Sequence, residues 1–218
     1  MGRPVAIFDL DSTLLEGDCE QMWCSFMARK HKVDADFLKT IQKYYADYEL
    51  GCLDYVEYEK FLLYPLTQCT ADEVNGLVDE YVSEVLPLFR PNIVQRLEDH
   101  RARGNVLLLA SASNNLLLQP IAHYLHIPNL ICTWVEMQGG VPTGELAGEA
   151  PFREAKARLI QAWVTENRLS LQESWGYSDS HNDLPFLNLV EHPVAVTPDA
   201  ILRQYALSRG WPILEKIV

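Results

Sequence analysis

Short, uninterrupted apolar runs recur along the chain, and they constrain its fold more than any other feature. The first, P-V-A-I-F-D at residues 4–9, ends in an acid. A run without polar alternation is typical of a strand buried on both faces, as in a parallel sheet. Further runs of this kind predict strands at residues 105–110, 130–134, 174–177 and 193–196.

Helical patterns lie between these expected strands. One begins near Pro91 and ends at Gly104, which are start and stop signals for a helix. Another, over residues 152–166, places Leu159, Ile160 and Trp163 on one face. Because strands that alternate with helices form a parallel sheet covered on both sides, we predict an α/β protein with a Rossmann-like core.

The segment from residue 16 to 86 departs from this alternation. It contains no convincing strand and predicts four helices, at residues 20–32, 35–49, 55–64 and 71–85. Since connections between strands are usually short, we interpret residues 16–86 as an inserted all-helical cap domain. The core domain would then comprise residues 1–15 and 87–218. Thr70 and Glu73 form a capping-box pattern for the last of the four helices, and Gly139-Gly140 predicts a hairpin turn.

Two acids follow the first expected strand, Asp9 and Asp11 in D-L-D-S-T. In open α/β sheets, ligands bind beyond the carboxyl ends of the strands. There, one carboxylate can attack phosphorus and become an aspartyl phosphate. The other can give a proton to the leaving alcohol and later take one from water. The alternative interpretation is a turn in which Asp11 and Ser12 cap the following segment.

Two later segments supply groups that suit an anion. Ser111 ends the second expected strand, where a hydroxyl and a following helix N-terminus can hold a phosphate. Ser113 is alternatively only a helix N-cap. Lys156 lies near a helix start, where the dipole disfavours a cation, and this indicates an anion nearby. The alternative is a solvated surface lysine, with Arg153 and Arg158 as competing cations.

The fourth expected strand runs into a second acid pair, Asp179 and Asp183, in Y-S-D-S-H-N-D-L-P. Magnesium prefers oxygen ligands and keeps several waters. Asp9, Asp179 and the backbone carbonyl of Asp11 could therefore hold it. Asp183 would then orient these ligands. The alternative is an Asx turn with N-capping, and His181 is interpreted as a surface turn residue. In a parallel sheet all these strand ends converge on one crevice.

Together these positions resemble the four motifs of the haloacid dehalogenase superfamily. The matching residues are Asp9, Asp11, Thr13, Ser111, Lys156, Ser178, Asp179 and Asp183. The resemblance covers the whole chain and is closer to the branch that includes phosphoserine phosphatases, which carry a helical cap after the first motif. Residues 177–185, 193–199 and 209–214 resemble a bacterial group of hydrolases in that branch. Some members of the broader group act on histidinol phosphate or phosphatidylglycerophosphate.

The resemblance implies roles for the acids. Asp9 would be the nucleophile and a magnesium ligand. Asp11 would be the general acid/base and lend its carbonyl to the metal. Asp179 would bind magnesium, and Asp183 would support the metal site. The implied cofactor is Mg²⁺, and the implied reaction is hydrolysis of a phosphomonoester.

The resemblance also implies which residues hold the phosphate. Ser111 and Lys156 would bind phosphate oxygens, Thr13 would steady the first loop, and Asn182 would lie near the phosphate. The partner is then a small phosphorylated metabolite.

Departures from the phosphoserine phosphatase pattern concern the substrate. That group carries an acid early in the cap that meets the substrate amine, and Asp18 stands at about that place. It also carries an arginine that meets the carboxylate, where this chain aligns Lys60, which lacks the planar fork for a bidentate grip. Its second motif continues with two glycines, and this one reads S-A-S from Ser111. An amine-bearing substrate without a carboxylate, such as histidinol phosphate, is therefore a hypothesis.

Composition narrows the class of protein. With 18 Lys and Arg against 30 Asp and Glu, the net charge of −12 argues against nonspecific nucleic-acid binding. No apolar stretch approaches the ~20 residues of a membrane span. The five cysteines include no C-x-x-C pair, which is typical of reduced, mostly buried thiols. We expect a cytoplasmic enzyme that is a monomer or homodimer.

Several alternatives stay open. A phosphotransferase would use the same residues with another acceptor. A signalling receiver domain also uses acids, a hydroxyl and a lysine, but its acceptor lies on a later strand and it lacks the helical cap. A phosphate-binding scaffold would bind without turnover, and a carbon–halogen hydrolase would not need the magnesium acids. The aromatic side chains of the cap either form its core, which their helical spacing favours, or line a pocket: Trp23, Phe26, Phe37, Tyr44 and Tyr45.

Overall fold

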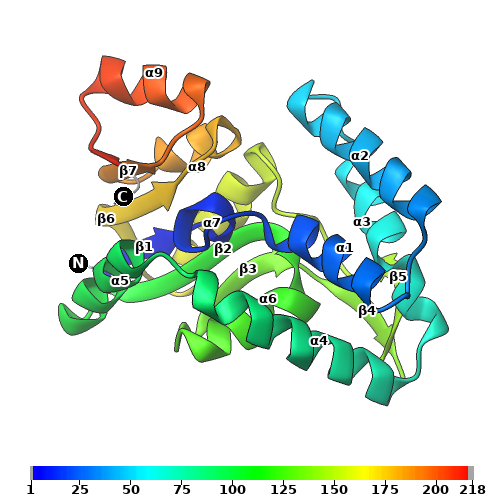
Figure 1. Cartoon of the computed structure of the whole chain (residues 1–218). Coiled ribbons are helices and arrows are strands. Elements are labelled where there is room, and N and C mark those ends of the chain that lie inside the picture. Colours follow the sequence, from blue (N-terminus) through cyan, green and yellow to red (C-terminus); the bar gives the residue numbers. More distant parts are fainter. Residues whose placement is uncertain (1, 216–218) are drawn as a thin grey trace.

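A six-stranded parallel sheet forms the centre of the computed structural model, which describes residues 2–215 (Figure 1). The strand order is β3-β2-β1-β6-β7-β8. The bounds are β1 (Pro4–Phe8), β2 (Val106–Asn114), β3 (Asn129–Thr133), β6 (Ser170–Ser178), β7 (His192–Val196) and β8 (Ile213–Leu214). The α/β prediction and its five strands are confirmed. The sequence analysis missed β8, whose two residues are too short for a hydrophobic period.

Helices cover both faces of the sheet. In β1, Val5 and Ile7 pack toward α7 (Glu154–Glu166), α8 (Leu184–Leu187) and α9 (Ala200–Arg209). Ala6 and Phe8 pack on the other face, toward α5 (Pro91–Ala102) and α6 (Asn115–Tyr124). All four side chains are fully buried. This alternation explains the unbroken apolar run, because successive strand residues point to opposite faces and both faces are covered.

Between β1 and α5 the chain forms helices only. They are η1 (Leu10–Leu14), α1 (Cys19–Arg29), α2 (Ala35–Glu49), α3 (Tyr55–Leu63), η2 (Tyr64–Gln68), α4 (Ala71–Val85) and η3 (Leu86–Leu88). The four helix predictions are confirmed to within a few residues at their ends. The capping box is also confirmed: the backbone N–H of Glu73 donates to Thr70 Oγ1, and that of Thr70 donates to Glu73 Oε2. We call residues 16–86 the helical insertion.

The helical insertion shares the core of the sheet on the side of α5 and α6. Trp23, Phe26 and Tyr81 contact one another inside the same cluster that contains Phe8. The Tyr81 hydroxyl donates to the carbonyl of Cys19, which fixes α4 against the start of α1. In Figure 1, α1 and α4 lie next to the sheet, whereas α2 lies farther out. The base of the insertion is therefore held by apolar burial.

A two-stranded antiparallel hairpin follows β3 and packs against the insertion. It consists of β4 (Val135–Gln138) and β5 (Val141–Leu146), with Gly139 and Gly140 at positive φ in the predicted turn. The hairpin contacts α3 and η2 (Figure 1). The insertion is thus supported by the sheet at its base and by a projecting hairpin near its far end.

All five cysteines are free, and Cys19, Cys24 and Cys132 are buried, as the sequence predicts for structural thiols. Within residues 2–215, no helix combines the length and apolar character that crossing a membrane requires.

Candidate active site

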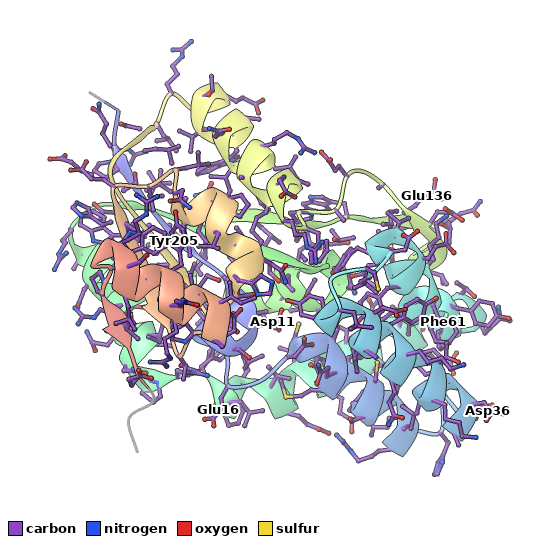
Figure 2. The ribbon with its side chains drawn as sticks, turned by 90° about the horizontal axis from the view of Figure 1, so that it is seen from above. Asp11, Glu16, Asp36, Phe61, Glu136 and Tyr205 are labelled. Carbon is purple, nitrogen blue, oxygen red and sulfur yellow. The ribbon has the colours of Figure 1, made fainter. Side chains whose placement is uncertain are left out.

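One cavity of about 590 Å³ lies where the strand ends meet the helical insertion. Asp9 follows β1, Ser111 lies in β2, and Asp179 follows β6, so the parallel sheet brings all three to one edge. In Figure 2, Asp11 lies between the core and the insertion, which is marked by Phe61 and Asp36. The structure places these predicted residues on the cavity: Asp9, Asp11, Asp18, Ser111, Lys156, Asp179, Asn182 and Asp183.

Lys156 joins two of the acids. Its Nζ lies 3.0 Å from Asp9 Oδ1 and 2.7 Å from Asp183 Oδ1. Lys156 is 4% exposed, so it is no solvated surface lysine. Burial lowers the pKa of Lys156, but the charges of Asp183 and Asp9 outweigh burial and raise it above its usual range. The ammonium therefore stays charged at the floor of the cavity, where an anion can approach it.

Asp9 is 6% exposed, and this burial changes its chemistry. Burial raises its pKa to about 7; Lys156 opposes that rise, while Asp183 and Asp11 add to it. Asp183 is anchored by Ser178, whose hydroxyl donates to its Oδ2 over 2.7 Å. The arrangement holds the Asp9 carboxylate next to a cation that favours its ionised form.

Asp11 is fixed by donors from both sides. Its Oδ1 accepts from the backbone N–H of Cys19 at 2.6 Å, at the N-terminus of α1. Its Oδ2 accepts from Ser113 Oγ at 2.9 Å and from Ser111 Oγ at 3.3 Å. The N-cap of α6 is Asn114 and not Ser113, so the interpretation of Ser113 as only a cap is wrong. Its sequence signal was the hydroxyl two residues after Ser111, on the same face of the strand.

Few groups in the described part of the chain offset the negative charge of Asp179. It accepts one long hydrogen bond, 3.4 Å from the hydroxyl of fully buried Thr13. Burial raises the pKa of Asp179 well above its usual range, and the charges of Asp9, Asp183 and Asp11 raise it further. In residues 2–215 no Lys or Arg pairs with Asp179. A divalent cation between Asp9 and Asp179 would remove this repulsion.

The donor set suits magnesium in particular. Over the described range of the chain, no three His, Cys, Asp or Glu side chains form a ready-made metal cage. Magnesium is usually held by one or two carboxylates, with waters and substrate oxygens filling the octahedron. Asp9 and Asp179 supply two such carboxylates on one cavity, and the cavity leaves room for the other ligands.

Asn182 links this site to the helical insertion. Its Nδ2 donates to the hydroxyl of Tyr48 in α2 over 2.8 Å. Its Oδ1 accepts from Arg153 Nε over 3.0 Å, and Arg153 Nη1 donates to the carbonyl of Gly51 over 3.1 Å. Arg153, which the sequence analysis treated only as a competing cation, thus bridges the core and the insertion. Its backbone holds φ at 54°, which is rare for a residue with a side chain, and no local pattern predicts this conformation.

Asp18 and Lys60, the two residues expected to read the substrate, have different environments. Asp18 lines the cavity, and its Oδ1 accepts from the backbone N–H groups of Glu20 and Gln21 as the N-cap of α1. Burial, followed by the charge of Asp11, raises its pKa to about 7. Lys60 is outside the cavity lining and pairs with Glu145 of β5 at 2.8 Å. Successive helix residues point about 100° apart, and Glu59 takes the buried position on α3 instead.

The aromatic residues of the insertion divide between core and cavity. Trp23 and Phe26 are core residues, and Phe37 stacks on Phe61 with ring centroids 4.7 Å apart. Tyr45 lines the cavity together with three tyrosines that the sequence analysis did not single out: Tyr48, Tyr55 and Tyr58. His181 is a partly exposed turn residue whose Nδ1 lies 2.8 Å from Asp199 Oδ2.

Comparisons with known proteins agree with this geometry. The model of the haloacid dehalogenase-like hydrolases matches residues 6–188. A histidinol-phosphatase of Neisseria meningitidis serogroup C (strain 8013) is 36% identical over 218 residues, covering 97% of this chain and 98% of that protein. Phosphoserine phosphatase SerB1 of Mycobacterium tuberculosis (strain ATCC 25618 / H37Rv) is 28% identical over 213 residues, covering 95% of this chain and 69% of that protein.

Solved structures show the same fold. A protein of unknown function from Bordetella pertussis Tohama I has a TM-score of 0.91 at 31% identity, and each chain is covered over its full length. A substrate-bound phosphoserine phosphatase has a TM-score of 0.72 at 14% identity, covering 98% of this chain and 93% of that one. The chain therefore belongs to the haloacid dehalogenase-like hydrolases and is a phosphatase of that family.

Proposed function

We propose that this enzyme hydrolyses a small phosphomonoester with magnesium, through an acyl phosphate formed on Asp9. The observation that carries the proposal is the pairing of Asp9 with a buried, charged Lys156 on a cavity that also holds Asp11 and Asp179. A carboxylate at a strand end can act as nucleophile only if the charge of the phosphate is neutralised. Lys156 supplies one fixed positive charge for this purpose.

The side chains of this site divide the reaction between them. Asp9 attacks phosphorus, and the bond to the leaving oxygen breaks. Lys156 and the Ser111 hydroxyl hold equatorial phosphate oxygens. Magnesium, bound by Asp9, Asp179 and the carbonyl of Asp11, would supply the remaining charge neutralisation. These groups offset the repulsion between an anionic carboxylate and an anionic phosphate.

Asp11 would move the proton in both steps. It protonates the leaving oxygen in the first step and takes a proton from water in the second. Its hydrogen bonds from Cys19 N–H and from two serine hydroxyls fix its position. The water that Asp11 deprotonates then attacks the phosphorus of the acyl phosphate, which releases inorganic phosphate and restores the Asp9 carboxylate.

The helical insertion would act as a cap domain over the core. Tyr48 and Gly51 lie in the outer part of the insertion. Tyr48 contacts the core through Asn182, and Gly51 contacts it through Arg153. Closure of such a cap excludes bulk water, which otherwise screens the charges that Lys156 and the carboxylates present to the substrate. We propose that the cap domain comprises residues 16–86 and that residues 1–15 and 87–218 form the core domain.

The substrate that we propose carries an amine or imidazole and no carboxylate, such as histidinol phosphate. Asp18 lines the cavity and offers a carboxylate to a cation. Lys60, the residue aligned with a carboxylate-binding arginine, pairs with Glu145 instead. The 36% identity to a protein named histidinol-phosphatase supports the same substrate. We place the enzyme in the cytoplasm, where its five free cysteines would stay reduced.

The test is release of inorganic phosphate from a panel of phosphomonoesters, with magnesium and with a chelator. The panel contains histidinol phosphate, phosphoserine, sugar phosphates and glycerol 3-phosphate. We expect magnesium-dependent release, fastest with histidinol phosphate. Asp9→Asn, which keeps the shape of the side chain, should lose at least about a thousandfold in kcat, as removal of a nucleophile does.

Circular dichroism of Asp9→Asn checks that the fold is kept. Wild-type activity in this folded variant would remove the covalent mechanism. Absence of phosphate release from every compound, with the acyl phosphate trapped on Asp9, would indicate transfer to an acceptor other than water.

A further inference from the structure

Two glutamates of the helical insertion meet in its interior, beside the leaving-group end of the cavity. Glu20 of α1 is 4% exposed and Glu59 of α3 is fully buried. Burial and then the charge of Glu59 raise the pKa of Glu20 well above its usual range, and a hydrogen bond joins the two carboxyl groups. Burying two acids together is costly unless a cation or donors compensate them.

The donors around this pair come from two residues. The backbone N–H of Asn114 donates to Glu20 Oε1 over 3.2 Å, and its Nδ2 lies 3.3 Å from both Glu20 Oε1 and Glu59 Oε2. The Tyr55 hydroxyl donates to Glu59 Oε1 over 3.0 Å. Between residues 2 and 215, no Lys or Arg forms an ion pair with either glutamate. The protein therefore supplies no cation to the pair, whose charge is reduced only by the proton that the two carboxyl groups share.

Asn114 adds an acceptor that has no partner. Its Oδ1 is buried and receives no hydrogen bond, although the residue is only 2% exposed. The same amide carries the Nδ2 that donates to both glutamates, so the orientation of Asn114 follows from the pair. Buried polar atoms without a partner are rare and costly. Asn114 therefore bears a cost in order to hold the two carboxylates in place.

The cavity gives a ligand access to this place. Glu20 lines it, together with Asp18 and the rings of Tyr45, Tyr55 and Tyr58. The Lys and Arg side chains that line the cavity, Lys156 and Arg153, are core residues near the phosphate end. Aromatic faces and carboxylates together suit a cationic nitrogen, which the rings attract and the acids pair with.

We propose that Glu20, positioned by Glu59 and Asn114, binds a protonated amine or imidazolium of the leaving alcohol and selects for it. This proposal rests on the proposed function, because it names the residues that bind the leaving group at the other end of the same cavity. Glu20 contacts the cation, and Glu59 is a positioning residue behind it. A cationic nitrogen that binds here takes the place of the proton that the two carboxyl groups share, and this proton passes to solvent.

The test is the variant Glu59→Gln, which replaces an ionisable carboxyl group by an amide and keeps the volume. For histidinol phosphate, kcat/KM should fall roughly tenfold or more through KM, which is the loss expected for a charge-assisted contact. For glycerol 3-phosphate, which has no nitrogen, kcat/KM should stay within about threefold. Glu20→Gln should show the same selectivity. Glu57→Gln, at an exposed position of the same helix, is the matched control and should change neither substrate.

Equal losses for the two substrates, or no loss for either, would overturn the proposal in favour of a purely structural carboxyl pair. A binding measurement separates this outcome from failure of the proposed function. Histidinol itself, titrated calorimetrically into the magnesium-loaded protein, should bind roughly tenfold more weakly to Glu59→Gln than to the wild type. If the variant binds histidinol more weakly but the wild type releases no phosphate from any compound, Glu20 and Glu59 still bind the cation and the phosphatase mechanism is rejected.

Discussion

Lys156 shows how a single side chain can be both costly and necessary. A buried ammonium loses hydration worth several kcal/mol, and here two carboxylates, Asp9 and Asp183, compensate it at 3.0 and 2.7 Å. Two acids with one lysine leave a negative surplus, to which Asp179 adds. The site is therefore built with fewer positive charges than its acids need, and this deficit favours a divalent cation.

Asp18 makes a testable contribution to the pH dependence of stability. Its pKa is about 7 in the folded protein against 3.8 for a free side chain. The folded state thus binds this proton more tightly than the unfolded chain, and stability falls as pH rises from about 4 to about 7. Asp18→Asn keeps the helix cap and cannot ionise. In chelator, its free energy of unfolding at pH 8 should exceed that of the wild type by on the order of 1 kcal/mol, with no difference at pH 4.

Urea denaturation at the two pH values measures this difference. Asp34→Asn, the same substitution at the exposed N-cap of α2, serves as the control. An equal gain at pH 4 and pH 8 would show that the effect comes from the cap and not from the charge.

At the scale of elements, one arginine and one asparagine join the outer insertion to the core. Arg153 bonds to Asn182 and to the carbonyl of Gly51, and Asn182 bonds to Tyr48. The core also holds α2 and α3 through the hydrogen bond from Asn114 to Glu59 and through the ring of Phe152, and the rest of their support comes from their own packing and from the hairpin. This part of the insertion therefore has the features of a segment that opens locally.

Arg153→Gln should weaken this link without removing a catalytic group. We expect KM to rise by about tenfold, since one charge-assisted bond is worth about 1.5–3 kcal/mol, and amide hydrogen exchange to accelerate in residues 48–53. Arg158→Gln, which changes a residue of α7 in an exposed ion pair with Glu149, should leave both unchanged. Unchanged exchange in Arg153→Gln would mean that the insertion is held by other contacts.

How far the sequence predicts these elements depends on the range of the interaction involved. Helices α1–α4 and the strand ends follow local periods and capping residues, and they were predicted closely. Lys60 was misplaced because an alignment without structure cannot tell which of two neighbouring residues faces inward. Arg153 and the Glu20–Glu59 pair depend on contacts between segments about 30 to 100 residues apart, and no local pattern encodes those. The strand β8 is defined only by its pairing with β7.

The molecule as a whole is acidic, with a net charge of −12. Its field attracts cations and repels phosphates, so the substrate must be drawn in by local positive charge. Lys156 and Arg153 both line the cavity, which concentrates positive charge at the phosphate end. On the proposed function, this separation of charge along one cavity would orient a substrate with an anionic phosphate and a cationic leaving group.

Magnesium bound at the proposed site should stabilise the whole protein, because only the folded state brings Asp9 and Asp179 to one cavity. At about 100 times its Kd, the gain in the free energy of unfolding is about 2.7 kcal/mol. Thermal denaturation at a saturating concentration of MgCl₂ should show a higher Tm than in NaCl of equal ionic strength. Asp179→Asn should lose most of this increment. An equal Tm shift in the variant would mean that the ion binds elsewhere.

The twelve residues from Asp9 to Glu20 join the attacking carboxylate to the carboxylate proposed to receive the leaving group. Most of this stretch is buried, and Asp11, Thr13 and Asp18 are each tied down by hydrogen bonds. This segment, which joins the sheet to α1, therefore sets a fixed distance between the two carboxylates. On the proposed function, substrates would be selected by length as well as by charge, because a leaving alcohol too short to reach Glu20 could be hydrolysed but would bind weakly.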